Sequence, residues 1–297
     1  MSNSNSVNQG LKMNVIPKLS QLSSRVWRVL GCNPGPMTLQ GTNIYLVGTG
    51  RKRVLIDAGQ DGFPEYVQNL TKLLNDENVK IEHLVLTHWH HDHVGALPEI
   101  EPILKNDTPF VYKFPTIEPQ DVPIPSSFKF TPINNNHILK TEGATLRVIH
   151  TPGHTTDHAI LYLEEEKAVF SGDCILGEGT SVFEDLFEYM KSLNIILELE
   201  PKLIYPSHGP VIDDPSEKIQ FYIYHRLQRE KQILSVIQAS EVPLTPTEIV
   251  RKVYQDTPEY LYPAAEVNVR HHLTKLIKEN RIQENDDKFF VREDGKI

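Results

Sequence analysis

The segment THWHHDHVG, residues 87–95, gathers side chains that bind metal ions. It supplies His88, His90, Asp92 and His93 within six positions, directly after the apolar run EHLVL. Imidazole nitrogens and carboxylate oxygens are ligands for zinc and for related metals. One short loop rarely directs four such groups at a single ion, so two adjacent ions would use them better. The segment therefore predicts a metal centre, with two ions in preference to one.

Three more candidate ligands lie further along the chain, each in a turn or at the end of an expected strand. They are His154 in TPGHTTDH, Asp173 at the end of AVFSGD, and His208 in PSHGP. Seven ligands with a bridging water would suit two ions about 3.5 to 4 Å apart, the spacing of two-metal hydrolases. Two zinc ions would lower the pKa of the shared water and make hydroxide available at neutral pH. The residues therefore predict a hydrolytic site.

The elements that must position these residues alternate short strands with a few helices between Arg25 and about Pro210. NIYLV and RVLIDAG flank GTGRK as a hairpin, PEYVQNLTKLLND has helical spacing, and HLVLTH is typical of a buried strand. TLRVIHTPG, HAILYLE, KAVFSGD and KLIYPSHG predict four further strands. Ser181 and Glu184 have capping-box spacing, which predicts that a helix begins there. The order predicts an α/β fold of two packed sheets covered by helices, with the candidate ligands at one edge.

After Pro215 the pattern becomes helical. SEKIQFYIYHRLQREKQILSVIQAS predicts a long helix. Thr245 and Glu248 give a second capping-box signal, with Pro246 at the first helical position. AAEVNVRHHLTKLIKEN predicts another helix, and RIQE with KFFVR predicts a hairpin. Helix, helix and hairpin outline a small winged-helix domain.

The composition limits the classes of function. The formal net charge is -9, and residues 215–297 carry 13 Lys+Arg against 13 Asp+Glu, so the negative excess lies before them. This balance argues against broad electrostatic capture of nucleic acid, although bound metal would add local positive charge. No apolar run approaches the ~18 residues of a membrane span, so we expect no membrane partner. Two cysteines, Cys32 and Cys174, indicate a reducing compartment inside the cell.

The motifs THWHHDHVG, TPGHTTDH, SGD and SHG, in this order, resemble those of the metallo-β-lactamase superfamily. Aspartate at position 173 resembles the glyoxalase II-like branch, in which hydrolases of the glyoxalase II and ribonuclease Z kinds carry a bridging aspartate, whereas antibiotic-hydrolysing members commonly have cysteine there. The resemblance implies an αβ/βα sandwich with the metal centre at one edge of its sheets. It also implies that one zinc ion is bound by His88, His90 and His154, that the other is bound by Asp92, His93 and His208, and that Asp173 bridges them.

A closer resemblance covers nearly the whole chain. NPGPMTLQGTNIYLVGTG, GDCILGEGTSVFEDL, YPSHGPVI and HRLQREKQIL, together with the winged helix, resemble the lactamase-β-like protein 2 family. This family is described as dizinc endoribonucleases that act on single-stranded RNA, associated in animals with the mitochondrial matrix. The resemblance implies two Zn²⁺ ions as cofactors and single-stranded RNA as the substrate. It favours the matrix over the cytoplasm, although the polar N-terminal segment shows no clear presequence.

Within this scheme Asp92 is the candidate catalytic residue, because it would orient the nucleophile as well as bind metal. The neutral charge of the winged helix argues against duplex DNA as a partner. We expect this domain to act as a lid that packs against the sandwich and helps to form a groove for RNA. Two other functions stay open. A glyoxalase II-like thioester hydrolase would use the same metal centre, and an RNA-binding scaffold without activity is the alternative outside the enzymes.

Residues beside the ligands are expected to support the centre or to be structural. Asp57 resembles the strand-end aspartate that supports the metal loop in this superfamily, and His158 is a second candidate for such a role. Residues 33–43 are expected to form a wall of the substrate cleft. His91 lies at a position that the motif leaves free, and we expect it to belong to the loop or to support a ligand. The remaining assignments are structural: His83, His137, His225, Trp89 and Cys174. We expect three parts of the chain: a disordered segment over residues 1–20, a metallo-β-lactamase domain over 21–214, and a helical linker with the winged helix over 215–297.

Overall fold

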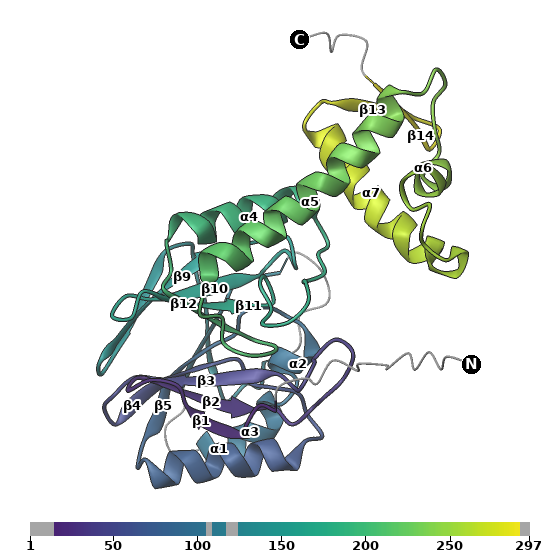
Figure 1. Ribbon diagram of the computed structural model, residues 1–297. Coiled ribbons are helices and arrows are strands. Elements are labelled where there is room, and N and C mark those ends of the chain that lie inside the picture. Colours follow the sequence, from purple (N-terminus) through teal and green to yellow (C-terminus); the bar gives the residue numbers. More distant parts are fainter. Residues whose placement is uncertain (1–14, 105–108, 117–123, 292–297) are drawn as a thin grey trace, which may run out of the picture.

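The computed structural model describes residues 15–104, 109–116 and 124–291 (Figure 1). Two sheets lie face to face in the middle of the larger part, and helices cover the outer face of each sheet. A smaller domain follows at the far end of a long helix. The layers follow the order helix, sheet, sheet, helix, which confirms the predicted αβ/βα sandwich.

The first sheet contains seven strands in chain order. They are β1 (Leu19–Gln21), β2 (Val26–Leu30), β3 (Asn43–Val47), β4 (Lys52–Ile56), β5 (Lys80–Val85), β6 (Phe110–Lys113) and β7 (Lys129–Pro132). Strands β1 to β4 pair antiparallel, whereas β4 to β7 pair parallel. Parallel neighbours need a crossover connection. The crossovers after β4 and β5 contain α1 (Pro64–Asp76), α2 (His91–Val94) and α3 (Leu97–Leu104).

The second sheet contains five strands in the order β12-β11-β10-β9-β8. They are β8 (His137–Thr141), β9 (Ala144–His150), β10 (Ala159–Leu163), β11 (Ala168–Gly172) and β12 (Leu203–Pro206). Strands β8 to β11 pair antiparallel, and β11 pairs parallel with β12. Helix α4 (Leu186–Glu198) connects these two parallel strands and lies on the outer face of the sheet.

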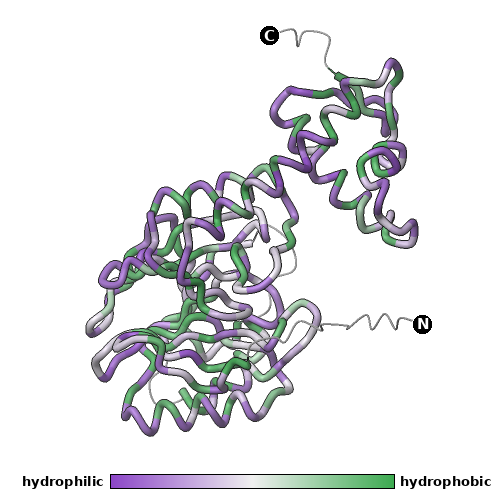
Figure 2. The backbone as a smooth tube through the Cα atoms, in the orientation of Figure 1, coloured by the Kyte–Doolittle hydropathy of each residue, from purple (hydrophilic) through white to green (hydrophobic). Residues whose placement is uncertain are grey.

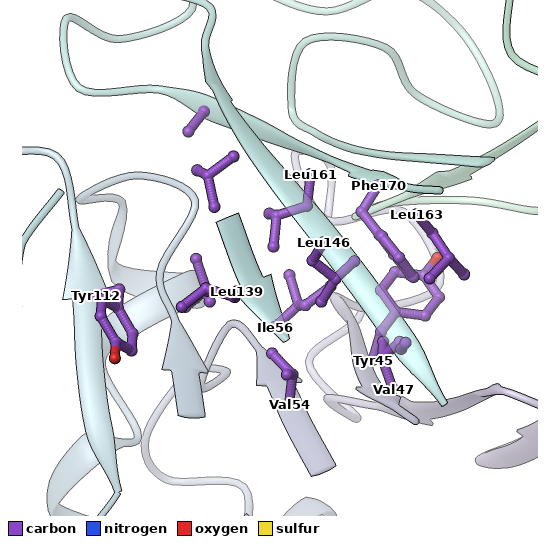
Figure 3. Packing of buried hydrophobic residues seen from close by; sticks show 14 of the residues in the cluster. Tyr45, Val47, Val54, Ile56, Tyr112, Leu139, Leu146, Leu161, Leu163 and Phe170 are labelled. Atoms are coloured by element: carbon purple, nitrogen blue, oxygen red, sulfur yellow. The ribbon is translucent and has the colours of Figure 1, made fainter. Parts of the chain in front are cut away.

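Strand β3 shows how the sequence builds the layers. Tyr45 and Val47 pack into the core between the sheets, whereas Ile44 and Leu46 pack toward α1 and α3. Every residue of β3 is buried, because side chains alternate between two covered faces. Figure 3 shows the core between the sheets, where residues of the second sheet meet those of β3 and β4. The outer helices change between green and purple along their length in Figure 2, as expected for helices with one buried face.

The start of α4 differs from the prediction. The prediction that a capping box at Ser181 and Glu184 begins this helix is wrong, because the helix begins at Leu186. Its cap is Asp185, whose Oδ1 accepts hydrogen bonds from the backbone N–H groups of Phe187 at 2.9 Å and Glu188 at 3.3 Å. Residues 181–185 therefore stay outside the helix.

The N-terminal segment is also more ordered at its end than its composition predicts. Residues 1–14 lie outside the described part of the chain, and Leu19–Gln21 form β1 instead of continuing the disordered segment. The reason is tertiary: the backbone of β1 pairs with β2, from Leu19 opposite Val29 to Gln21 opposite Trp27. Local composition carries no information about such pairing.

The smaller domain has the predicted winged-helix order. Its elements are α5 (Pro215–Gln238), α6 (Pro246–Val253), the 3-10 helix η1 (Glu259–Leu261), α7 (Tyr262–Lys278), β13 (Ile282–Asn285) and β14 (Lys288–Val291). The capping box at Thr245 and Glu248 is confirmed, with Pro246 in the first helical turn. Among the described residues, no helix is both long and apolar enough to cross a lipid bilayer.

Helix α5 is shared by both parts of the molecule. Ile219 and Tyr222, in its first half, pack into the core beneath the second sheet. Ile233 and Ile237, in its last turns, belong to the core of the winged helix. The predicted boundary at residue 214 therefore falls at the start of a helix that is built into both cores.

A buried group of charges fixes α5 against α7. Glu230 is only 5% exposed, and its carboxylate accepts a hydrogen bond of 2.6 Å from Lys275 Nζ and one of 3.2 Å from Arg281 Nη1. Burial alone would raise the pKa of Glu230, but contacts with His272 and Lys275 outweigh burial and lower it. Removing one partner from such a group leaves a buried charge uncompensated, which is strongly unfavourable.

We expect Glu230→Gln to lower the free energy of unfolding by about 2 to 4 kcal/mol, measured by urea denaturation at pH 7. Because the folded pKa lies below the unfolded value of about 4.3, the contribution of Glu230 is complete above that pH and is lost as the pH falls below it. The stability of the parent should therefore drop below about pH 4.3 more steeply than that of the variant. The control is Glu266→Gln on α7, whose partner Arg270 is exposed, and it should cost less than about 1 kcal/mol.

Candidate metal centre

The candidate ligands are assembled by parallel strands whose carboxyl ends lie at one edge of the sandwich. Strand β4 runs parallel to β5, and β11 runs parallel to β12, so each pair ends on the same side. Asp57 follows β4, the metal loop follows β5, Asp173 follows β11, and His208 lies just beyond β12. His154 lies in the turn after β9. Because the ligands follow rigid strands, their positions are set by the sheets themselves.

One group of donor atoms contains three histidines and an aspartate. His90 Nδ1 lies 2.9 Å from His88 Nε2 and 3.1 Å from His154 Nε2. Asp173 Oδ2 lies 4.0 Å from His88 Nε2 and 3.5 Å from His154 Nε2. Four donors around one small volume match the ligand set of a divalent transition metal.

A second group lies directly beside the first and contains Asp92, His93 and His208. Asp92 Oδ2 lies 3.2 Å from His93 Nε2 and 3.3 Å from His208 Nε2. The other oxygen of Asp173, Oδ1, lies 3.5 Å from His93 Nε2 and 3.2 Å from His208 Nε2. The two oxygens of Asp173 therefore face different donor groups, which is the geometry of a bridging carboxylate.

The structure thus brings all seven sequence-predicted ligands together, in the grouping that the resemblance implies. Two of the inward-facing atoms, His93 Nε2 and Asp173 Oδ1, are buried and form no hydrogen bond within the described part of the chain. Buried polar atoms without partners are costly, so inward-facing donors of this kind fit a bound cation. The residues present therefore fit the divalent metal ions that the donor set implies.

The electrostatics of the two groups differ. Burial, reinforced by neighbouring histidines, holds the pKa of His88 well below its usual range and lowers the pKa of His90 to about 4. Burial would also lower the pKa of His208, but contact with the Asp173 carboxylate raises it to about 9. Burial opposes ionisation of Asp173, yet His208 and His93 hold its pKa well below the usual value. The first group therefore presents neutral imidazoles, which is the form that binds metal.

Hydrogen bonds behind the ligands fix the orientation of the metal loop. Asp57 is fully buried, and its Oδ2 lies 2.8 Å from His93 Nδ1 and accepts a hydrogen bond of 3.0 Å from Thr87 Oγ1. Its Oδ1 accepts a hydrogen bond of 2.8 Å from the backbone N–H of Thr87. Thr87 Oγ1 also lies 2.9 Å from His88 Nδ1. Asp57 thus supports the loop as expected, because partners of this kind set which ring nitrogen faces the metal.

The segment over residues 33–43 closes one side of the centre. Thr42 is buried, and its Oγ1 donates a hydrogen bond of 2.9 Å to Asp92 Oδ2. Asn33 holds Thr42 in place, since its Oδ1 accepts from the backbone N–H of Thr42 at 2.9 Å and its Nδ2 donates to Thr42 Oγ1 at 3.0 Å. The sequence places this segment at the cleft but gives no signal that singles out Thr42.

The other histidines near the motif do not join the donor groups. His158 Nε2 accepts a hydrogen bond of 3.1 Å from the backbone N–H of Asp173, so it supports a ligand from behind. His91 Nε2 lies 2.6 Å from Asp61 Oδ1 on the outer side of the loop. Trp89 packs edge-on against His90 with ring centroids 4.6 Å apart, and Cys174 is fully buried. These positions agree with their predicted supporting or structural roles.

Comparisons with known proteins agree with this geometry. The model of the metallo-beta-lactamase superfamily matches residues 37–208, and that of the beta-lactamase associated winged helix domain matches residues 245–291. A Drosophila melanogaster relative described as a Beta-lactamase-like protein 2 homolog is 50% identical over 287 residues, which cover 94% of this chain and 98% of the relative. Both resemblances found in the sequence are thereby confirmed.

Solved structures show the same fold. A metallo-beta-lactamase family protein from Thermus thermophilus superimposes with a TM-score of 0.68 at 20% identity, over 92% of this chain and 100% of that chain. A second structure, described as being in a di-iron-bound form, has a TM-score of 0.50 at 30% identity and covers 64% of this chain and 96% of its own. The sandwich and its winged helix therefore recur together in known structures.

Gly153 gives a test of how tightly the turn before His154 is built. Its φ is +129°, and an added Cβ would lie 2.3 Å from the backbone nitrogen of Tyr189 in α4. Gly153→Ala should lower the free energy of unfolding by about 2 to 5 kcal/mol, since it combines backbone strain with overlap against a rigid helix. The measurement is urea denaturation, with Gly62→Ala as the control because Gly62 also has a positive φ, +79°, but open space around it. Equal losses for both variants would show that the contact with α4 is unimportant.

Proposed function

Since this chain belongs to the metallo-beta-lactamase superfamily, we propose that it is a dizinc endoribonuclease that hydrolyses phosphodiester bonds of single-stranded RNA. The family and the cluster of histidines and aspartates imply a metal-dependent hydrolase that uses divalent ions. The observation that carries the two-metal proposal is the position of Asp173, whose two oxygens face two separate donor groups. A single ion would leave one of these groups without a partner.

Zinc is the metal proposed for both positions. Imidazole nitrogens and carboxylate oxygens suit zinc, and a first group of three neutral histidines is a usual zinc ligand set. The same donors also suit iron. A 30% identical structure is described as being in a di-iron-bound form, so the identity of the metal is part of the test below.

The chain positions Asp92 as the proposed catalytic residue. When bound, the two ions would supply a nucleophile from water at neutral pH and offset the charge on the phosphate oxygens. Asp92 is the more accessible of the two carboxylates, with 18% of its side chain exposed against 12% for Asp173. The hydrogen bond from Thr42 Oγ1 fixes the Asp92 carboxylate, so its orientation toward an attacking water is set before substrate binds.

Charge pairing within the winged helix supports a substrate other than duplex DNA. Arg270 donates to Glu266 and Asp287, Lys275 is buried against Glu230, and Lys278 pairs with Asp185. Each of these basic residues of α7 therefore already has an acidic partner in the protein, although Arg270 and Lys278 are exposed. A helix that reads a DNA groove needs its basic side chains free for phosphates.

Exposed apolar side chains on two segments that contact candidate ligands support a single-stranded substrate. Met37 lies in the segment over residues 33–43, which contacts Asp92 through Thr42, and is 65% exposed. Val182, whose carbonyl contacts His154, is 53% exposed. Bases of a single strand offer apolar faces to such residues, whereas the bases of a duplex are stacked and hidden.

The alternative enzyme is a glyoxalase II-like thioester hydrolase, because the same metal centre would hydrolyse a thioester. The proposal favours RNA because the resemblance to the lactamase-β-like protein 2 family spans the winged helix as well as the sandwich. An RNA-binding scaffold without activity is the other alternative. It would have no need for seven converging ligands.

The first test compares the parent with Asp173→Ala on a labelled single-stranded RNA and on a glutathione thioester. We expect RNA cleavage by the parent, a loss of at least about 100-fold in the variant, and a fall from two bound metals per chain measured by elemental analysis. The control is Asp76→Ala on the surface of α1, which should retain activity and metal. Thioester turnover with intact RNA would support the glyoxalase-like alternative, and inactivity on both substrates would support the scaffold.

The second test concerns the cleaved ends. Because water is the proposed nucleophile, the products should carry 5′-phosphate and 3′-hydroxyl ends. An RNA with a single 2′-deoxy nucleotide at the cleavage position should still be cut, since the neighbouring 2′-hydroxyl takes no part. Both results are read from the end groups by mass spectrometry. Cyclic 2′,3′-phosphate products, or complete resistance of the deoxy-substituted RNA, would contradict the proposal.

A further inference from the structure

The segment over residues 181–185 contacts the turn of a candidate ligand from outside the sheets. It has no helical or strand structure and precedes α4 directly. The backbone N–H groups of Glu184 and Asp185 donate to the carbonyl of Gly153 at 2.8 and 3.0 Å. The carbonyl of Val182 lies 2.9 Å from His154 Nδ1. The segment therefore holds both the turn and the ring of His154.

The candidate ligands differ in what supports their outer nitrogens. His93 Nδ1 faces the carboxylate of Asp57, and His88 Nδ1 faces the hydroxyl of Thr87. Both of these supporting residues are fully buried at the ends of strands. His154 Nδ1 faces the carbonyl of Val182 at 2.9 Å and the hydroxyl of Ser181 at 3.5 Å; both residues lie in an irregular segment, and Val182 is 53% exposed. Its orientation is therefore secure only if another part of the chain fixes this segment.

Arg226 of α5 fulfils this condition. It is only 6% exposed, and its Nη2 donates a hydrogen bond of 2.8 Å to the carbonyl of Ser181, one residue before Val182. Its guanidinium lies 4.9 Å from the ring centroid of Phe183 and 5.5 Å from that of Tyr189. A carbonyl acceptor and neighbouring aromatic rings together fix both the position of a buried guanidinium and the orientation of its plane.

We propose that Arg226 is a positioning residue for the metal centre, which holds residues 181–185 so that the Val182 carbonyl orients His154. Arg226 itself does not contact the donor groups and acts through two backbone carbonyls. The proposal rests on the metal-binding role of His154 given under the proposed function, but it is independent of the substrate.

The winged helix contacts the same segment from another side. The ring of Phe183 meets that of His271 at 5.2 Å, edge to face, and Lys278 pairs with Asp185. These contacts are more exposed than Arg226, because the side chains of Lys278 and Asp185 are 40% and 33% accessible. They support the outer side of the segment, whereas Arg226 binds the carbonyl next to the one that faces His154.

The test uses Arg226→Met, which keeps an apolar stem but removes the donor to Ser181. In zinc-loaded protein labelled with ¹⁵N-histidine, the Nδ1 protons of His154 and His93 report directly on their hydrogen bonds. We expect exchange of the His154 proton with solvent to become at least about 10-fold faster, while the His93 proton is unchanged. Competition with a chelator should show that the affinity for one of the two zinc ions falls by about 10-fold, the lower end of the range for residues that support metal ligands.

The matched control is Arg229→Met, three residues along the same helix. Arg229 lies over the ring of Tyr254, with 4.0 Å between its guanidinium carbon and the ring centroid, so this variant removes a cation from α5 without touching residues 181–185. It should leave both histidine signals and both zinc equilibria unchanged. Arg226→Lys retains the charge but replaces the planar guanidinium with a flexible ammonium group, which would hold the carbonyl of Ser181 less rigidly. It should give an intermediate exchange rate for the His154 proton.

The outcomes separate this proposal from the proposed function. Unchanged His154 exchange and zinc affinity in folded Arg226→Met would overturn the positioning role and show that Arg226 only packs. If Arg226→Met does not fold, the Arg226→Lys exchange rate decides in the same way. Absence of zinc binding by the parent would instead overturn the metal-binding role of His154, whatever Arg226 does. An equal increase in the exchange rates of the His93 and His154 Nδ1 protons would also contradict the proposal, because it would indicate a general loss of structure.

Discussion

The structure depends on gathering seven polar donors, five of them buried and two partly buried, in one small volume at the edge of the sandwich. Removing imidazoles and carboxylates from water is unfavourable unless each has a partner. The fold compensates from behind for some of them: Asp57 and Thr87 face the outer ring nitrogens of His93 and His88, and His158 accepts from the backbone N–H of Asp173, whereas His208 Nδ1 forms no hydrogen bond within the described residues. The inward-facing atoms have no such protein partners for His93 and Asp173 within the described residues. Two cations would complete the compensation, which connects the stability of this edge to the bound metal.

Much of this arrangement could be predicted from the sequence, because it follows from local pattern. Helix α1 occupies Pro64–Asp76, the stretch with helical spacing, and the donors lie at strand ends where the chain turns. The start of α4 could not be predicted, because Ser181 and Glu184 carry a capping signal that the tertiary structure overrides. In an α-helix the carbonyl of Val182 would accept a hydrogen bond from within the helix. It faces His154 Nδ1 instead, and a helix that included this residue would replace that contact with a hydrogen bond inside the helix.

Contacts made by backbone atoms explain what else the sequence did not reveal. The support of His154 is a carbonyl, and any residue type at position 182 could supply it. Thr42 is one of many threonines, and only the fold of residues 33–43 brings it to Asp92. Arg226 lies far from His154 in the chain and reaches the segment over residues 181–185 because α5 packs on the second sheet. Helix α5 thus connects the two cores. The same helix carries Arg226, so it joins the winged helix to the segment that contacts His154.

Charge would give the bound metal ions a second role besides the proposed activation of water. The first 214 residues carry the whole net charge of -9, and the carboxylates of Asp57, Asp92 and Asp173 lie within the centre or directly behind it. A phosphodiester would be repelled by these carboxylates alone. Two divalent ions would add four positive charges and reverse the sign of the local field, because bound cations are the largest charges in such a site. Metal loading would therefore decide whether an anionic substrate binds as well as whether it is cleaved, and a basic protein surface is not required.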